Sequence, residues 1–324
     1  MNIDMIRAAA ARTAGHVRQT PLLSSPFLDE IAGRRVLIKA ECLQVTGSFK
    51  YRGGRSAVSA IVAEGGAKGV IAYSSGNHAQ GVAMAAREFD LPAVIVMPSD
   101  APAVKIANTR ALGAEVVLYD RGSESREEIG ERIMEERGLR LIRPYDEPLV
   151  IAGQGTCGLE IASQAADAGV TEADVLVCCG GGGLTAGIAL ALAADAPGLR
   201  PRPVEPEAFD DVARSLASGK REQNAQTSGG LLDAILTPSP GELTFPILRD
   251  HCGPGLTVTD DEALSAMAEA FQRLRVVAEP GGAAALAAAL FQPEAVAGDT
   301  VIAVITGGNV DKPVFVQALS KLDS

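Results

Sequence analysis

The stretch TGSFKYRGG at residues 46–54 places a single lysine, Lys50, among small and turn-forming residues. It follows the apolar run 36–41, which predicts a strand, and it leads into a helical pattern at 53–64. The glycines allow another group to approach the backbone closely, and Phe49 supplies an aromatic face beside the amine. Burial lowers the pKa of a lysine amine, which can then bind a carbonyl compound as a Schiff base. Taken alone, the stretch also fits a solvated lysine at the start of a helix.

Outward from Lys50, short apolar runs alternate with helical spans, which is the pattern of an α/β protein. We expect strands at 36–41, 70–73, 93–97, 115–118, 175–178, 203–205, 256–258 and 300–305. We expect helices at 4–18, 53–64, 77–89, 103–112, 124–137, 155–168, 184–195, 208–218, 260–274, 281–291 and 311–320. This alternation predicts mostly parallel, twisted sheets that helices cover on both faces.

The length of 324 residues predicts two domains. Three strand–helix units follow one another closely between about residues 69 and 145. We therefore expect a small domain at 65–145 and a large domain made of residues 1–64 plus 146–324. The Gly-, Ser- and Pro-rich span 218–241 predicts a long ordered loop.

Composition excludes several classes of function. The net charge is −11, from 29 basic and 40 acidic residues, so nucleic acid and anionic membrane surfaces are not expected as partners. The N-terminus lacks the pattern of a signal peptide, and no apolar run reaches membrane-spanning length. The five cysteines have no framework spacing, which favours a reducing compartment. We expect a cytoplasmic protein.

A second polar stretch, SSGNHAQG at residues 74–81, follows a predicted strand and opens a predicted helix. Backbone N–H groups at such a helix start bind an anion, for example a carboxylate. Asn77 can hydrogen-bond a phenolic or carbonyl oxygen, and Ser75 can carry a proton. Ordinary capping of the helix by Ser or Asn is the alternative, and it accounts for one of these residues.

A third stretch, CCGGGGLTAG at residues 178–187, also lies between a predicted strand and a predicted helix. Its glycines, Gly180, Gly181, Gly182 and Gly183, offer unobstructed N–H groups to a phosphate. Gly181, Gly183 and Ala186 also satisfy a loose dinucleotide fingerprint, with Glu205 at about the distance of a ribose-binding acid. A nicotinamide-dependent oxidoreductase is therefore an alternative, although it leaves Lys50 and the 74–81 stretch unexplained.

The fourth stretch, VITGGN at residues 304–309, closes the last predicted strand. A hydroxyl there, from Thr306, can hydrogen-bond a ring nitrogen in the crevice at the strand ends. A tight turn after a core strand is the alternative. Together, the four stretches supply an amine, an aromatic face, an amide donor, a phosphate site and a hydroxyl, which is the set that holds pyridoxal phosphate.

With these four motifs in this order, the chain from about residue 5 to 320 closely resembles the fold type II pyridoxal-phosphate family of threonine/serine dehydratases, serine racemase and 3-hydroxyaspartate dehydratases. The resemblance implies the tryptophan synthase β-like α/β fold. It implies that Lys50 binds the cofactor as a Schiff base, with Phe49 against the ring. The residues of the Ser74, Ser75, Gly76, Asn77 and His78 loop would bind the substrate carboxylate, with Asn77 also on the cofactor's phenolic oxygen.

The resemblance also implies that Gly180–Gly183 hold the phosphate and that Thr306 faces the pyridine nitrogen. Glu279, in the segment AEPG at 278–281, matches an acid close to the active site. The implied activity is a catabolic dehydratase that eliminates water from a β-hydroxy amino acid and releases a keto acid and ammonia. Lys50 would take the Cα proton.

Several related activities remain open under the same resemblance. Ser75 lies on the opposite face in serine racemase and would reprotonate Cα there, so a serine or aspartate racemase is an alternative. A β-replacement enzyme and a non-catalytic amino-acid-binding relative are others. Relatives are commonly dimers, which implies a homodimer.

Two carboxylates six residues apart, Glu205 and Asp211, follow a predicted strand. With a backbone carbonyl between them they can share a hard cation, and acidic residues at a helix start are the alternative. The resemblance to serine racemase implies a divalent cation (Mg²⁺, Mn²⁺ or Ca²⁺) bound by Glu205, the Phe209 carbonyl and Asp211.

Our prediction of what the substrate carries besides its β-hydroxyl group depends on one arginine. Arg132, in the predicted helix 124–137, aligns with an arginine that reaches a dicarboxylate ligand in serine racemase. A guanidinium there suits the distal carboxylate of 3-hydroxyaspartate. The alternative is a water-facing helix in which Glu128 and Arg132 pair four residues apart. Where threonine dehydratases carry an Ala-Asp-Gly segment, residues 227–233 read TSGGLLD, which weakens the case for threonine.

Overall fold

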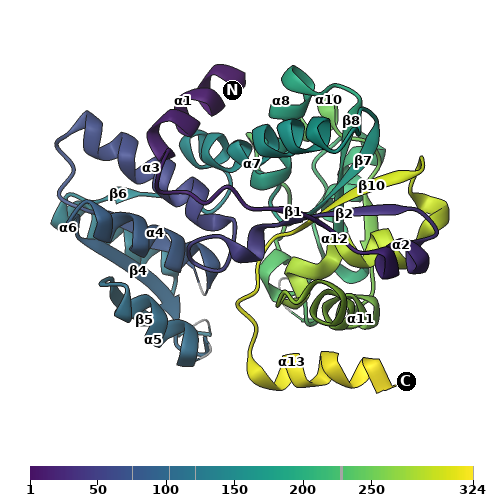
Figure 1. Ribbon diagram of the computed structural model, residues 1–324. Helices are drawn as coiled ribbons and strands as arrows, with labels where there is room; N and C mark the ends of the chain where they lie inside the picture. Colours follow the sequence, from purple (N-terminus) through teal and green to yellow (C-terminus); the bar gives the residue numbers. More distant parts are fainter. Residues whose placement is uncertain (75, 102, 121, 227–228, 324) are drawn as a thin grey trace.

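Two separate sheets organise the chain in the computed structural model, which describes residues 1–74, 76–101, 103–120, 122–226 and 229–323. The six-stranded sheet has the order β1-β2-β10-β7-β8-β9, and the four-stranded sheet has the order β5-β4-β3-β6. Figure 1 shows β4 and β6 in one part of the molecule and β2, β7 and β10 in the other. β1 pairs antiparallel with β2, and the other strand pairs are parallel. The expected α/β class is confirmed.

The elements have the following bounds. The strands are β1 (Leu22–Ser24), β2 (Arg35–Ala40), β3 (Val70–Tyr73), β4 (Ala93–Pro98), β5 (Glu115–Tyr119), β6 (Arg140–Leu141), β7 (Ala173–Cys178), β8 (Leu199–Pro206), β9 (Leu256–Val258) and β10 (Thr300–Ile305). The α-helices are α1 (Ile3–Thr13), α2 (Pro26–Ala32), α3 (Lys50–Glu64), α4 (Asn77–Glu88), α5 (Ala103–Ala111), α6 (Arg126–Arg137), α7 (Pro148–Asp167), α8 (Gly183–Asp195), α9 (Asp211–Ser218), α10 (Thr244–His251), α11 (Asp260–Glu269), α12 (Pro280–Phe291) and α13 (Lys312–Leu319). Short turns include η1 (Glu41–Leu43), η2 (Glu207–Phe209), η3 (Asp233–Ile235) and the π-helical η4 (Ala270–Leu274).

The central strands are buried on both faces, as parallel strands between helix layers must be. Every residue of β7 is buried, and so are Val301–Ile305 of β10. The alanine-rich α12 is buried from Pro280 to Leu290 and packs against β7, β8 and β10. Small side chains let this helix approach the sheet closely, which is why a chain with few aromatic residues still forms a dense core.

Glycines bring α7 and α8 into close contact. A Cβ atom built on Gly187 of α8 would lie 2.6 Å from the Gly155 nitrogen and from the Ile151 oxygen, both on α7. On Gly153 it would lie 2.5 Å from the Arg52 oxygen of α3. Helix backbones this close exclude any larger residue.

The same glycines explain a wrong boundary. The sequence predicts a helix at 155–168, but α7 begins at Pro148, because its glycines stabilise packing on α3 and α8 instead of ending the helix. Helix α1 ends at Thr13, before Gly15 takes a φ of +79°, and not at residue 18. Elements that the sequence did not predict are short or lie at edges, namely α2, α10, β1 and β6.

The four-stranded sheet uses strands from Val70 to Leu141, inside the range expected for a small domain. Its core also includes Tyr51, Ala57 and Val58 of α3, so that helix packs on both parts. The division into 65–145 and the remainder therefore stays a proposal. Within the described ranges, none of the helices combines the length and the apolar character that crossing a bilayer requires.

Candidate active site

Lys50 lies in the first turn of α3, where the sequence stretch 46–54 meets the end of β10. The Phe49 N–H donates to the Thr306 carbonyl at 3.0 Å. The Lys50 Nζ lies 5.1 Å from the centroid of the Phe49 ring and donates to the Pro144 carbonyl at 2.9 Å. Loss of solvent lowers the pKa of Lys50 to about 8, against the opposing charge of Glu279. A substantial fraction of this amine is neutral near pH 8.

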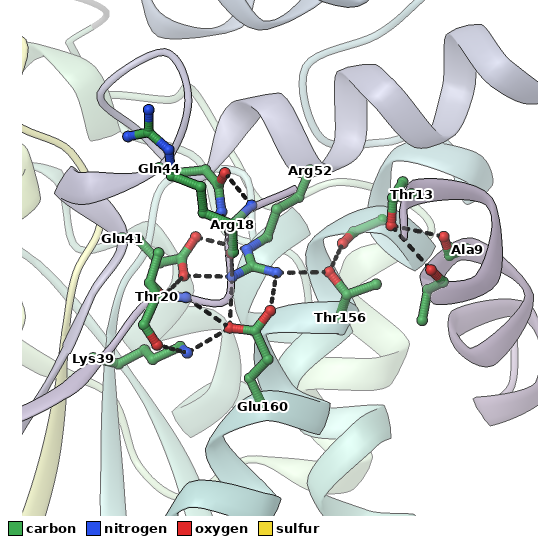
Figure 2. Close-up of polar contacts among 12 residues, drawn as sticks. Ala9, Thr13, Arg18, Thr20, Lys39, Glu41, Gln44, Arg52, Thr156 and Glu160 are labelled. Atoms are coloured by element: carbon green, nitrogen blue, oxygen red, sulfur yellow. Dashed lines mark hydrogen bonds and ion pairs between the residues drawn. The ribbon is translucent and has the colours of Figure 1, made fainter. Parts of the chain in front are cut away.

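The start of α3 is held by buried charges two residues beyond Lys50. Figure 2 shows the Arg52 guanidinium between the carboxylates of Glu41 and Glu160. Arg52 binds each of them through two nitrogens at 2.7–2.8 Å, and Lys39 binds Glu160 at 2.5 Å. Arg52 and Lys39 have no exposed surface. Bidentate pairs of this kind fix orientation, so the cluster positions the helix that carries Lys50.

Glu279 joins three of the predicted stretches through amide side chains. It accepts a hydrogen bond from the Asn77 Nδ2 at 2.6 Å, and the Asn77 Oδ1 accepts from the Asn309 Nδ2 at 2.7 Å. Asn309 also donates to the Thr46 carbonyl at 2.9 Å. Burial raises the pKa of Glu279 to about 7, against the Asn77 hydrogen bond and the charge of Lys105. The network orients Asn77 and places a titratable carboxyl near Lys50.

The loop before α4 presents backbone N–H groups. The Gly76 N–H donates to the Ser74 hydroxyl at 3.1 Å, and α4 begins at Asn77. Ser75, the predicted proton donor, lies outside the described residues. Burial, followed by the charge of Lys50, lowers the pKa of His78 to about 3, and its Nε2 lies 2.9 Å from the Ile142 carbonyl. A neutral His78 that donates to this carbonyl anchors the loop and brings no positive charge to a substrate carboxylate.

The four glycines form the turn into α8. Gly182 has a φ of +88°, a backbone conformation that favours glycine. Tyr145 packs on this turn, because a Cβ on Gly181 would lie 2.3 Å from its ring. The N–H groups of Gly180, Gly181 and Gly182 donate to no other described residue. The turn thus offers free donors at a helix N-terminus, as an anion requires.

Thr306 ends β10 with 4% of its surface exposed. Its N–H donates to the Gly282 carbonyl at 3.1 Å. The Cys178 thiol, whose pKa burial raises to about 11, donates to the carbonyls of Gly282 and Val304. The described cysteines are all free. The structure therefore brings Lys50, Asn77, Glu279 and Thr306 together.

The residues around Lys50 fit the predicted cofactor. The hydroxyls of Thr46 and Ser48 are buried without a hydrogen-bond partner among the described residues. Buried polar groups are rarely left unpaired, so orphaned hydroxyls beside an amine of lowered pKa and a turn of free N–H groups suit a polar ligand with a carbonyl and a phosphate.

The acidic pair joins the end of β8, which carries Glu205, to the start of α9, which begins at Asp211. Glu205 is fully buried and accepts from the N–H groups of Val212 at 2.9 Å and Ala213 at 2.7 Å. Burial, together with the charge of Asp211, raises the pKa of Glu205 well above its ordinary value. Each Glu205 oxygen therefore accepts one backbone N–H and keeps a lone pair for a further ligand.

Asp211 has one bound and one free oxygen. Its Oδ1 accepts from the Asn224 Nδ2 at 2.5 Å, and its buried Oδ2 has no partner among the described residues. Burial raises the pKa of Asp211 to about 6. Phe209 lies between the two carboxylates in η2. Throughout the described ranges, no group of three or more His, Cys, Asp or Glu side chains is arranged for a metal ion, so the predicted site consists of two carboxylates and a carbonyl.

Arg132 is exposed on α6, and no described residue forms an ion pair with it. The pair with Glu128, which the alternative of a water-facing helix implies, is absent from the described contacts, and Arg126 instead pairs with Glu127 at 2.7 Å. Desolvation lowers the pKa of Arg126, but Glu127 and the charges of Tyr119 and Tyr145 raise it above its ordinary value. Arg126 is exposed, as Arg132 is, but the charge of Tyr145, which packs on the glycine turn, reaches it.

The sequence analysis missed Tyr145, the Pro144 carbonyl and Asn309. The segment RPYDEP at 143–148 has two prolines and no motif of its own, and a carbonyl acceptor has no side-chain signature. Asn309 ends the fourth stretch, but only its contacts with Thr46 and Asn77 identify its role.

Comparison with known proteins gives one consistent set of similarities. Residues 13–307 match the family model described as pyridoxal-phosphate dependent enzyme. The chain is similar to an L-threo-3-hydroxyaspartate ammonia-lyase of Pseudomonas sp, with 44% identity over 308 residues and 95% of each chain covered. It is 41% identical to the protein of the same name from Saccharomyces cerevisiae, over 96% of this chain and 94% of that one. Among solved structures, a threonine deaminase from T.th. has a TM-score of 0.90 and 46% identity, covering 96% of this chain and 99% of its own.

Proposed function

Because the chain belongs to the family of pyridoxal-phosphate dependent enzymes, we propose that it is an ammonia-lyase that eliminates water from a β-hydroxy amino acid. The products are a keto acid and ammonia. We propose 3-hydroxyaspartate as the substrate ahead of threonine and serine. Two relatives at 44% and 41% identity carry that substrate in their names, and both match almost the full chain. Family membership sets aside the nicotinamide-dependent alternative.

The observation that carries this proposal is the Lys50 amine, with a pKa of about 8 and an aromatic ring 5.1 Å away. Pyridoxal phosphate, when bound, supplies an electron sink for the charge that develops at Cα. Lys50 holds the cofactor and acts as the base for the Cα proton, since its neutral form is populated near physiological pH. The carbonyl of Pro144 orients this amine.

The other residues bind and orient. The N–H groups of the first turn of α4, beginning at Asn77, would bind the substrate carboxylate, since the Gly76 N–H already donates to Ser74. Gly180–Gly183 hold the phosphate at the start of α8, and Phe49 packs on the ring. Thr306 would offer a neutral hydroxyl, and no charge, to the ring nitrogen of the cofactor. Glu279 orients the Asn77 amide by accepting its hydrogen bond, and Asn77 would in turn hydrogen-bond the phenolic oxygen of the cofactor.

Replacing Lys50 tests the proposal. In Lys50→Ala, we expect loss of the visible absorbance of lysine-bound pyridoxal phosphate and about a 10³-fold loss of activity. The exposed Lys68→Ala is the matched control. Activity is measured as keto acid and ammonia from L-threonine, L- and D-serine and the stereoisomers of 3-hydroxyaspartate. Failure of every one of these substrates to release ammonia from the loaded protein would overturn the proposal.

For the distal carboxylate of 3-hydroxyaspartate, we propose Arg126 in place of Arg132. The support is electrostatic: the charge of Tyr145 reaches the Arg126 guanidinium, although both arginines are exposed. Arg126→Gln should raise KM for 3-hydroxyaspartate about 10- to 100-fold and leave KM for L-threonine unchanged, because threonine has no second carboxylate. An effect of that size in Arg132→Gln instead would restore the original prediction.

We also propose that Glu205, the Phe209 carbonyl and Asp211 bind a divalent cation. Two observations support this site. The buried Oδ2 of Asp211 has no partner among the described residues, and the raised pKa of both carboxyls is what two acids without a nearby cation would show. Saturating Mg²⁺ at 100 times its Kd should then stabilise the protein by about 3 kcal/mol. Melting curves with Mg²⁺, Mn²⁺, Ca²⁺ and a chelator check this, and identical curves would remove the site.

The remaining expectations stay predictions. Racemase activity through Ser75 is checked by looking for D-serine formed from L-serine in the wild-type protein and in Ser75→Ala. A homodimer, whose test follows below, and a cytoplasmic location are also proposals.

A further inference from the structure

Lys105 and Asp233 form an ion pair between the two sheets. Lys105 lies on α5. This helix packs against the helix α4 and against β5, a strand of the four-stranded sheet. Asp233 begins η3, which packs against α12 beside the six-stranded sheet. The Lys105 Nζ lies 3.5 Å from the Asp233 Oδ2. The lysine side chain is only 12% exposed, whereas the aspartate side chain is 60% exposed. A lysine is rarely buried this far without a partner.

The lysine end of this pair covers the predicted substrate loop. A Cβ atom built on Gly76 would lie 3.6 Å from the Lys105 Cδ and 3.7 Å from its Nζ. Gly76 precedes Asn77, the first residue of α4. The position of Lys105 thus determines the space above the N–H groups that we propose for the substrate carboxylate.

The aspartate end is attached to the cofactor side of the site. A Cβ on Gly180 would lie 3.0 Å from the Ile235 oxygen, and one on Gly281 would lie 3.2 Å from Ala234 and 3.4 Å from Ile235. The short turn that carries Asp233 therefore packs on both the glycine turn and the start of α12. A shift of Asp233 would therefore move the surroundings of both segments.

The two charges also meet at Glu279. Burial dominates the raised pKa of this carboxyl, and after the Asn77 hydrogen bond the charge of Lys105 lowers the pKa and that of Asp233 raises it. Lys50 lowers it further. Lys105 and Asp233 are thus close enough to the site for their arrangement to matter there, although neither contributes a group to the four motifs.

We propose that the Lys105–Asp233 pair is a clasp that holds α5 and the Gly76 loop of the four-stranded sheet onto η3 beside the six-stranded sheet. Both are positioning residues, which act on a ligand through the Gly76 loop. Only the ligand-binding part of this proposal rests on the proposed function. Residues 227–233 differ from the Ala-Asp-Gly segment of threonine dehydratases. In this proposal Asp233, the last residue of that stretch, pairs with Lys105.

Hydrogen–deuterium exchange on the protein without added ligand tests the clasp directly. Lys105→Met and Asp233→Asn should each raise exchange about fivefold in peptides 76–88 and 231–236, which corresponds to the loss of one ion pair. Lys105→Arg should restore wild-type exchange. Arg110→Gln, which removes an exposed positive charge from the same helix, should leave both peptides unchanged. The double variant should exchange no faster than either single variant, because both break the same contact.

Binding of L-aspartate, which lacks a β-hydroxyl leaving group, separates the clasp from a direct role of Lys105. With the pyridoxal-phosphate-loaded protein in a calorimeter, both single variants should bind L-aspartate about 3- to 10-fold more weakly. If Lys105 were itself the ligand of the carboxylate, Asp233 would compete for it. Asp233→Asn would then bind more tightly, while Lys105→Met would bind more weakly, and that pair of results overturns the clasp.

Unchanged exchange in both single variants, or effects that add in the double variant, would also overturn it. A wild-type protein that fails to bind L-aspartate speaks against the proposed substrate class alone, since the exchange experiment needs no ligand. The two failures are therefore distinguishable.

Discussion

Lys50 and Arg52 lie two positions apart and have opposite electrostatic surroundings. Lys50 has lost water and donates to one carbonyl, so its pKa falls to about 8. Arg52 has also lost water, but Glu41 and Glu160 hold its pKa well above its ordinary value. One turn of helix therefore carries a reactive amine next to a permanently charged anchor.

At the same scale, Arg52→Met should destabilise the protein by about 3–5 kcal/mol, because it leaves Glu41 buried without its partner. Arg52→Lys should recover only part of this, since one ammonium cannot bind two carboxylates in a bidentate manner. Urea unfolding of the cofactor-free protein measures both. Arg249→Lys, at an exposed pair with Asp250, is the control and should change little. A cost of less than about 1 kcal/mol for Arg52→Met would contradict the anchoring role.

Glu279 predicts a pH-dependent stability. Its pKa is about 7 in the folded protein, above the ordinary value of 4.5, so the folded state favours the protonated carboxyl. The stability that this provides is complete below pH 4.5 and is lost as the pH rises to 7, amounting to about 3 kcal/mol. Glu279→Gln cannot ionise and should gain on the wild type over that interval. Urea unfolding from pH 4.5 to 7.5 checks this, and a pH-independent difference between the two proteins would exclude it.

At the scale of elements, the packing of α7 on α8 depends on glycines, which have no side chain to separate the two helices. Gly187→Ala places a Cβ 2.6 Å from two backbone atoms of α7, and backbone cannot move aside as a side chain can. We expect a loss of about 1–3 kcal/mol from overpacking, despite the better helix propensity of alanine. Gly122→Ala, whose Cβ would meet only Asp120 at 3.3 Å, is the control. Equal urea midpoints for the two variants would show that α7 and α8 adjust.

Element boundaries show what local pattern can and cannot predict. β10 matches its prediction at both ends, because a run of apolar β-branched residues ends at glycines. α7 does not, because glycines that signal a break locally are helical here through contact with α3 and α8. The expected helix 260–274 changes to a π-helical turn at Ala270 and stops before Arg275, whose φ is +62°.

At the scale of the whole molecule, α2 presents an uncovered apolar face. Phe27 is 53% exposed and Ile31, one turn later, is 38% exposed. The Arg273 guanidinium lies over the Phe27 ring, 4.8 Å from its centroid. Apolar side chains with an aromatic and an arginine at the centre are typical of protein interfaces. We propose that a second copy of the chain covers this face.

Sedimentation equilibrium of the wild type should then give a dimer. A double replacement, Phe27→Glu with Ile31→Glu, should weaken the dimer by more than about tenfold, because two charges would be buried. Val316→Glu on α13 changes an equally exposed apolar residue elsewhere and serves as the control. If the double variant associates as tightly as the wild type, α2 is not the interface.

The sequence alone predicted the α/β class, most strand positions and the motifs around Lys50, Asn77, the four glycines, Glu279 and Thr306. These features are local: apolar periodicity follows from the burial of strands, and the motifs consist of neighbouring residues in the chain. A motif of chemically distinctive residues can be recognised from a few neighbouring positions.

Tertiary structure decided the rest. The Pro144 carbonyl on Lys50, the Tyr145 ring on Gly181, the Asn309–Asn77–Glu279 chain and the Lys105–Asp233 pair each join segments that are far apart in sequence. The pKa values of Lys50 and Glu279 follow from the same contacts, since burial and neighbouring charges exist only once both sheets are assembled. The sequence names the groups that can react, and the fold sets their protonation and their partners.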